Sequence, residues 1–151
     1  MIDSQVIKSL LFKYFRFKRQ MLCVSEAVVY YRDIEDFIAF NNNEIYCIEV
    51  KVDKSDFIKD FTTKEKHRKS MKYHKFYFCV PESLVDFSLA YLKNYPNYGL
   101  LVARNNKIES RKIAKSNKSV LKIEQKIYNS LILRMSSELA NEKLKTLKEQ
   151  K

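Results

Sequence analysis

Asp36, Glu49 and Lys51 are the residues whose types and spacing could carry out chemistry in this chain. Glu49 and Lys51 end the apolar, β-prone stretch 44–52, and being two residues apart they project from the same face of a strand. Buried strands rarely hold a carboxylate and an ammonium without a reason. The alternative is an exposed strand end with a weak ion pair. The same Glu–x–Lys spacing recurs in polar stretches at 124–126 and 149–151, so the tripeptide alone is uninformative.

The asparagine-rich turn 41–43 decides whether Asp36 meets Glu49. If residues 42 and 43 form a two-residue loop, Asp36 lies opposite Glu49, with Cβ atoms roughly 5 Å apart. A three-residue loop places Asp36 opposite Ile48, on the wrong face unless a bulge restores the register. Two carboxylates that close repel each other unless a cation lies between them. The shorter loop therefore predicts a cation site.

The charge of the chain is strongly positive, with 29 basic and 18 acidic side chains and a net charge of +11. Such a balance favours a polyanionic partner, which could be DNA, RNA or an anionic membrane surface, and simple solubility is the alternative. Carboxylates nevertheless gather in one stretch, as Glu26, Asp33, Glu35 and Asp36. Clustered carboxylates in a cationic protein suggest Mg²⁺ or Mn²⁺ held beside a bound polyanion.

Several basic side chains could contact a nucleic-acid backbone, although each taken singly could equally be a solvated surface residue. They are Arg32, Lys64, Lys66, Arg68, Lys69, Lys72, Arg104 and Lys107. His67 and His74 are isolated among lysines and are not favoured as general bases, because a metal-bound water needs none. Asp60 is a further carboxylate that could approach the site.

The elements that must position these residues follow from hydrophobic spacing. We expect a helix over 3–19 capped by Asp3 or Ser4, then strands over 21–31, 36–40 and 44–52. A helix over 54–74 capped by Ser55, a strand over 75–81 and a helix over 82–96 follow. Two strands within 98–113 and a helix from 117 to about 145, with frayed last residues, complete one domain, 1–151. The order α-β-β-β-α-β-α-β-β-α predicts a mixed sheet flanked by helices, in the α/β or α+β class.

The three cysteines, Cys23, Cys47 and Cys79, lie far apart in apolar stretches without zinc-site spacing, so they indicate buried thiols in a reducing cytosol. The N-terminal residues lack a signal-peptide pattern, and no apolar run has the length of a membrane span. A single glycine argues against a phosphate-binding loop or a dinucleotide fingerprint. We therefore expect a cytoplasmic protein with no membrane partner and no small-molecule cofactor.

The stretch Asp36–x12–Glu49–Val–Lys51, with apolar strands around it, resembles the PD-(D/E)XK nuclease superfamily. The longer segments 25–40, 47–60, 74–81 and 98–103, and the helix around 128–139, are similar to the MmcB family, whose members are assigned as DNA-repair endonucleases. The resemblance implies a restriction-endonuclease-like core. It makes Asp36, Glu49 and the assisting Glu26 metal-binding carboxylates, and Lys51 the motif lysine.

This chain departs from the pattern at two places. Glu35 replaces the proline before Asp36, and the glycine and paired arginines that usually precede the aspartate are missing, leaving Arg32 nearby. The resemblance implies a Mg²⁺-dependent deoxyribonuclease acting in DNA repair, recombination or mobile-element biology, and leaves a homodimer or an inactive homologue open. The alternative is a non-catalytic DNA- or RNA-binding module on the same fold. A third, weaker hypothesis is a toxin-like or accessory protein with an acidic protein partner.

Overall fold

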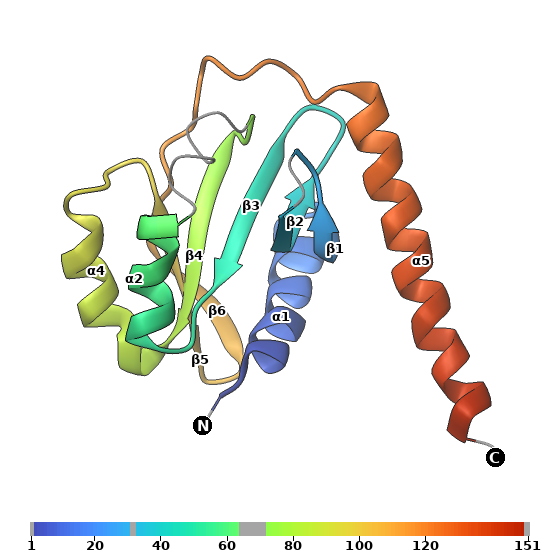
Figure 1. The fold of residues 1–151 in the computed structure, drawn as a ribbon, viewed down its shortest axis with the longest axis horizontal. Helices are drawn as coiled ribbons and strands as arrows, with labels where there is room; N and C mark the ends of the chain where they lie inside the picture. Colours follow the sequence, from blue (N-terminus) through green and yellow to red (C-terminus); the bar gives the residue numbers. More distant parts are fainter. Residues whose placement is uncertain (1, 31–32, 64–71, 150–151) are drawn as a thin grey trace.

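A six-stranded mixed sheet forms the centre of the computed structural model, which describes residues 2–30, 33–63 and 72–149 (Figure 1). The strands lie side by side in sequence order, from β1 to β6. The elements are α1 (Ser4–Phe12), the π-helical η1 (Lys13–Lys18), β1 (Leu22–Val28), β2 (Ile34–Phe40), β3 (Ile45–Val50), α2 (Lys54–Thr63), β4 (Lys75–Pro81), the 3₁₀ turn η2 (Glu82–Leu84), α4 (Val85–Leu92), β5 (Gly99–Arg104), β6 (Lys107–Lys112) and α5 (Gln125–Glu149).

Strand direction divides the sheet into three parts. β1, β2 and β3 form an antiparallel meander, β3, β4 and β5 run parallel, and β6 turns back along β5. The connection from β3 through α2 to the adjacent parallel strand β4 is the predicted helical crossover. The architecture is thus α+β with helices flanking a mixed sheet. It agrees with the predicted class and is consistent with a restriction-endonuclease-like core.

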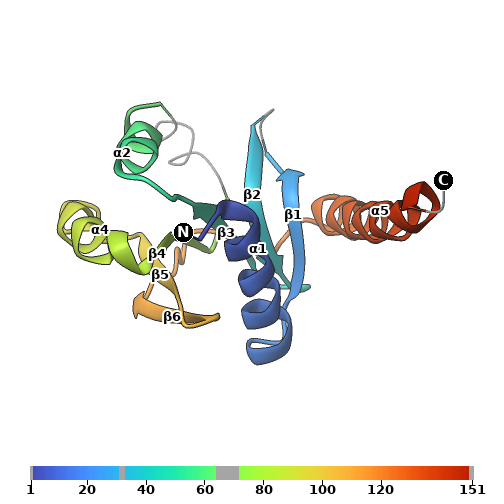
Figure 2. The same cartoon turned by 90° about the horizontal axis from the view of Figure 1, so that it is seen from below.

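Helices cover both faces of the sheet, so the molecule has two apolar cores. On one face α1 packs Ile7 and Leu11 against the strands. On the other face α2, α4 and α5 contribute Phe57, Leu92 and Leu131. Figures 1 and 2 show α2 and α4 next to each other, with α5 beside β1 at the opposite edge of the sheet. We call the face that carries α2, α4 and α5 the α2 face.

The turn between β2 and β3 is the two-residue loop, the shorter of the two alternatives that the asparagine-rich stretch left open. The backbone N–H of Asn41 donates to the carbonyl of Glu44 at 3.0 Å. The Asn41 side chain accepts from the backbone N–H groups of Asn43 and Glu44, each at 2.8 Å, which holds the turn closed. The two strands pair in regular register from this turn, starting with Phe40 opposite Ile45 and ending with Phe37 opposite Ile48. The observed pairing ends there, and continuing the same register by one step would put residue 36 opposite residue 49.

Three predicted helix details are wrong. The cap of α2 is Asp53, whose Oδ1 accepts from the Asp56 N–H at 2.9 Å, and not Ser55. The predicted helix 54–74 is too long: α2 is described as Lys54–Thr63, residues 64–71 lie outside the described residues, and residues 72–74 are not helical. The predicted helix from 117 begins only at 125, because the Asn117 side chain accepts from the N–H and hydroxyl of Ser119, a local turn that competes with a helix.

Candidate metal centre

Asp36 and Glu49 lie on neighbouring strands at the same end of the β2–β3 hairpin. The Asp36 carboxylate turns toward the β3 backbone, where its Oδ2 accepts from the Val50 N–H at 2.9 Å. Glu49 is 1% exposed, which excludes the alternative of an exposed strand end. The negative charge of Asp36 acts on Glu49 strongly enough to raise its pKa. The structure therefore brings together the two carboxylates that the hairpin count predicts to meet.

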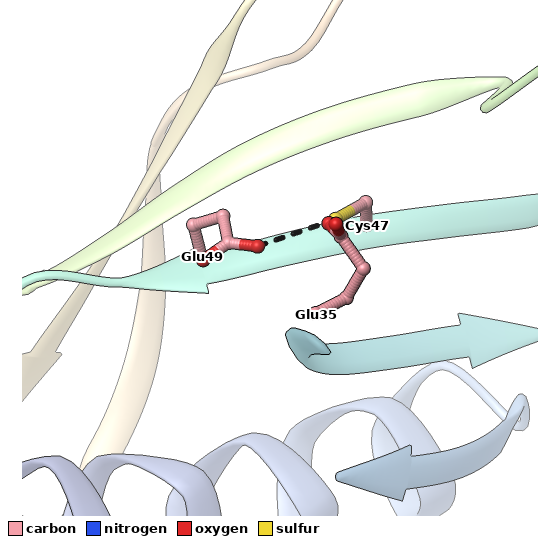
Figure 3. Close-up of side chains that lie close together, drawn as sticks. All are labelled: Glu35, Cys47 and Glu49. Carbon is pink, nitrogen blue, oxygen red and sulfur yellow. Dashed lines mark hydrogen bonds between the residues drawn. The ribbon is translucent and has the colours of Figure 1, made fainter. Parts of the chain in front are cut away.

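Glu35 and Cys47 complete a buried group around Glu49 (Figure 3). Glu35 Oε2 lies 2.7 Å from Cys47 Sγ, which in turn lies 3.9 Å from Glu49 Oε1. Glu35 is 5% exposed and Cys47 is fully buried. One donor atom from each of the three residues lies within 4.8 Å of the others, an arrangement that could hold a metal ion.

The electrostatics of this group are unfavourable without a positive charge. Burial, followed by the charges of Asp36 and Glu35, raises the pKa of Glu49 well above its usual range. Glu49 Oε2 is buried and has no hydrogen-bond partner among the described residues. Tyr73 lies close enough that the charges of Cys47 and Glu35 add to burial in raising its pKa. Buried carboxylates in this state are neutralised either by a proton or by a cation.

Lys51 is two residues beyond Glu49 in the chain and is paired with α2. Its Nζ lies 2.9 Å from Asp60 Oδ2, and the Asp60 side chain is fully buried. The Lys51 backbone N–H donates to the carbonyl of Cys79 at 3.0 Å, so the chain still follows β4 after β3 ends. Since α2 covers the same face that receives Glu49 and Cys47, Lys51 is on the predicted face, held by a partner on the helix.

The structure does not bring Glu26 to this group. Its Oε1 lies 3.1 Å from Lys8 Nζ on α1, which packs on the opposite face of the sheet. Glu26 has a left-handed backbone, with φ of 53°, and the β1–β2 pairing skips the position where Glu26 would oppose Asp36. This irregularity in β1 turns the Glu26 side chain toward α1. Glu35, on the neighbouring strand, supplies the third carboxylate instead.

Three of the predicted nucleic-acid-binding side chains lie within the described residues. Lys72 Nζ lies 3.6 Å from Glu124 and is two-thirds exposed, and Arg104 lies 3.3 Å from Glu82. Lys107 is exposed at the start of β6. β3, β4 and β5 run parallel, so their carboxyl ends lie on one side of the sheet. Arg104, at the end of β5, therefore lies at the same end of the strands as Lys51, which follows β3. The remaining candidates, Arg32, Lys64, Lys66, Arg68 and Lys69, lie outside the described residues.

Glu35 and Cys47 are the members of the group that the sequence prediction did not name as candidate ligands. Strict alternation along β2 places Glu35 on the face opposite Asp36, and Cys47 has the apolar neighbours of an ordinary buried thiol. Two signals pointed to them: Glu35 belongs to the acidic stretch, and Cys47 shares its strand face with Glu49. His74, by contrast, is structural. Its imidazole Nδ1 accepts from the Ile45 backbone N–H at 3.0 Å, and the His74 backbone N–H donates to the Ile45 carbonyl.

Within the described ranges, no helix has the length and apolarity needed to cross a membrane. No protein-family model and no curated protein matches the chain. Among solved structures, it is similar to the SPO1766 protein of unknown function from Silicibacter pomeroyi, with 19% sequence identity and a TM-score of 0.69. The match covers 99% of this chain and 94% of that one. At this identity the likeness shows a shared fold.

Proposed function

We propose that this chain is a Mg²⁺- or Mn²⁺-dependent deoxyribonuclease that hydrolyses phosphodiester bonds. The observation that carries the proposal is the convergence of the Asp36, Glu49 and Glu35 carboxyls at one end of the β2–β3 hairpin, with Lys51 two residues beyond Glu49 and paired with Asp60. The spacing of Asp36, Glu49 and Lys51 is also that of the PD-(D/E)XK motif, and the fold is of the matching class.

The residues fit the proposed ion. Mg²⁺ and Mn²⁺ prefer carboxylate oxygens, and three carboxyls approach one another here. Glu49 Oε2 is buried without a hydrogen-bond partner among the described residues, so a cation would satisfy an atom that is otherwise costly to bury. Asp36 and Glu49 would hold the ion, and Glu35 is close enough to add a third carboxylate.

The protein side chains have separate roles in this proposal. A bound ion would activate a water molecule and neutralise charge on the phosphodiester. The Val50 N–H orients the Asp36 carboxylate toward β3. Asp60 holds the Lys51 ammonium at the adjacent position on the same face, where its positive charge suits a developing phosphate charge.

The net charge of +11 supports DNA as the partner, since a backbone of phosphates binds cationic surfaces. Arg104 lies at the same sheet edge as Lys51, and Lys107 follows it directly after the β5–β6 turn. These positions suit contacts to the backbone on either side of a phosphate at the metal centre.

The second candidate is a non-catalytic DNA- or RNA-binding module. The depth of the carboxylate group favours it, because Glu49 and Cys47 are at most 1% exposed and Glu35 is only 5% exposed. A phosphate must reach an ion for hydrolysis, whereas a binding module needs only the basic surface. This candidate predicts DNA binding that survives the loss of Asp36, Glu49 and Lys51.

The test is a cleavage assay on supercoiled plasmid, single-stranded DNA and branched DNA, with Mg²⁺ or Mn²⁺ and with a chelator. The deoxyribonuclease proposal predicts ion-dependent cleavage that falls on the order of 100-fold or more in Glu49→Gln and in Lys51→Met. Glu109→Gln, on the far strand β6, is the matched control and should cut like the wild type. Failure of the wild type to cut any substrate, together with salt-sensitive DNA binding, would select the second candidate.

A further inference from the structure

The buried group around Glu49 contains a sulfur donor, which Mg²⁺ does not prefer. We propose that Glu35, Cys47 and Glu49 form a site for a thiophilic divalent cation of the Zn²⁺ class. Thiolate ligands select zinc-like ions, whereas Mg²⁺ takes oxygen ligands. This inference goes beyond the proposed function, since the site can be occupied whether or not the protein cuts DNA.

The distances between donor atoms suit a tetrahedral ion. With Zn–S near 2.3 Å and Zn–O near 2.0 Å, a sulfur and an oxygen ligand lie roughly 3.5 Å apart. The Cys47 Sγ distances of 2.7 Å to Glu35 Oε2 and 3.9 Å to Glu49 Oε1 fall on either side of that value. Shifts of less than about 1 Å in the side chains would reach it. Three protein ligands would leave the fourth position to water.

Burial supplies an independent reason for a ligand at this place. Glu49 is 1% exposed, and its Oε2 has no hydrogen-bond partner in the described part of the chain. Its Oε1 lies on the side of Cys47, so the orphaned carboxylate belongs to the donor group itself. The nearby Tyr73 hydroxyl is also buried without a hydrogen-bond partner among the described residues. Buried polar groups of this kind are normally paired or bound to a metal.

Glu35 and Glu49 belong both to this donor set and to the all-carboxylate set with Asp36. Because the two sets share two ligands, we expect a zinc-class ion and a magnesium-class ion to compete for them. The zinc-class ion gains the Cys47 sulfur, and the magnesium-class ion gains the Asp36 oxygens. Mg²⁺ should therefore weaken zinc-class binding only at a large excess.

The other two cysteines provide matched controls. Cys23 and Cys79 are buried in the core under α1, on the face opposite Cys47. Cys79 lies on β4, directly paired with β3, and burial raises the pKa of its thiol beyond the usual range. Cys79→Ser removes one buried thiol from the neighbouring strand without touching the donor group.

The experiment is a titration of the purified full chain with Co²⁺, followed by the thiolate-to-cobalt charge-transfer absorption, and then with Zn²⁺ to displace it. One equivalent of Co²⁺ should give the band in the wild type and in Cys79→Ser. Cys47→Ser should lose the band, and Glu49→Gln should weaken Co²⁺ binding at least tenfold. Addition of Zn²⁺ should raise the melting temperature of the wild type but not that of Cys47→Ser.

A wild type without the band overturns the inference, and this readout requires no variant to fold. A band that persists in Cys47→Ser, or in Cys47→Ala where serine disturbs folding, overturns it as well. The proposed function stands or falls separately. If the wild type and Cys47→Ser both lack the cobalt band and both cut DNA with Mg²⁺, the nuclease proposal is retained and the zinc-class site is rejected. A cobalt band in a protein that cuts no DNA would do the reverse.

Discussion

Asp36 and Glu49 lie at the same end of the β2–β3 hairpin, just beyond the last backbone pair, and after burial the charge of Asp36 is the next cause that raises the pKa of Glu49. The Val50 N–H, one residue beyond Glu49, donates to Asp36 Oδ2 and fixes this arrangement. The closeness of the two groups follows from the Asn41 turn, which sets the hairpin register. A short loop of polar residues thus determines where two charged side chains meet.

Glu49→Gln should stabilise the metal-free protein at neutral pH. The folded-state pKa of Glu49 lies above its ordinary value near 4.5, so the folded protein holds that proton more tightly than the unfolded chain. This contribution is fully present below pH 4.5 and is lost as the pH rises through the folded-state pKa. Thermal melts with chelator should show Glu49→Gln melting above the wild type at pH 7.5, with a difference that shrinks toward pH 4.

Glu109→Gln is the control for that series and should follow the wild type at every pH. A Glu49→Gln protein that melts below the wild type throughout the range would contradict the raised pKa. Saturating Mn²⁺ should raise the melting temperature of the wild type and narrow its difference from Glu49→Gln, because ligand binding stabilises only the form that binds.

Asp36→Asn should fold but lose metal affinity. The asparagine carbonyl oxygen can still accept from the Val50 N–H, while the charge that attracts a cation is removed. Calorimetric titration with Mn²⁺ should show a loss of at least about tenfold, since even outer partners of metal ligands contribute that much. Asp33→Asn, an exposed carboxylate before the same strand, is the control. Equal Mn²⁺ affinity in Asp36→Asn and wild type would remove Asp36 from the site.

Lys51→Met should destabilise the fold through Asp60. Loss of the ammonium leaves the Asp60 carboxylate buried without its ion-pair partner, and breaking a buried pair from one side costs about 3 kcal/mol or more. Urea denaturation should show this loss, and the double variant Lys51→Met/Asp60→Asn should recover part of it. If the two single changes simply add in the double variant, the ion pair does not couple these positions.

Gly99→Ala should destabilise the β4–β5 region. A Cβ at Gly99 would lie 2.4 Å from ring atoms of Tyr77 and 2.6 Å from the Ala114 backbone nitrogen, closer than atoms can pack. Overpacking of this kind costs about 1–3 kcal/mol. Urea denaturation measures the change, with Ser136→Ala on the exposed part of α5 as the control. Unchanged stability in Gly99→Ala would show that this packing is looser than the structure has it.

Lys107→Gln should weaken DNA binding without changing sequence preference. A phosphate contact contributes through counterion release, so its loss lowers the slope of log K against log salt by roughly 1. Fluorescence anisotropy across a salt series measures this slope. Lys143→Gln, at the far end of α5, should bind like the wild type. An unchanged slope in Lys107→Gln would place the DNA elsewhere on the surface.

The strands and the β2–β3 hairpin could be predicted from the sequence because they depend on local chemistry. Apolar runs of strand length predict the six strands, and Asn41 has the side chain that closes a two-residue turn. The start of α5 was predicted eight residues early, because residues 117–124 combine apolar spacing with the Asn117 turn. Apolar spacing alone does not show which of two local hydrogen-bonding patterns is the more stable.

The membership of the candidate metal centre could be predicted only in part. Alternation along regular strands predicts Asp36, Cys47 and Glu49 on one face, and the structure places the Asp36 carboxylate against the β3 backbone next to Glu49. Glu35 and Glu26 depart from alternation, since the β1–β2 pairing is irregular beside them and Glu26 adopts a left-handed backbone. Such an irregularity depends on how three strands and α1 pack together. No pattern within β1 or β2 alone predicts it.

The most direct test of the central claim is a crystal structure of the protein with Mn²⁺, analysed by anomalous scattering. The account predicts a manganese peak within about 2.5 Å of carboxylate oxygens from both Asp36 and Glu49, and no such peak in Glu49→Gln crystals grown in the same solution. A wild-type structure at saturating Mn²⁺ with no peak between these two residues, or with Mn²⁺ bound only elsewhere, would contradict the account.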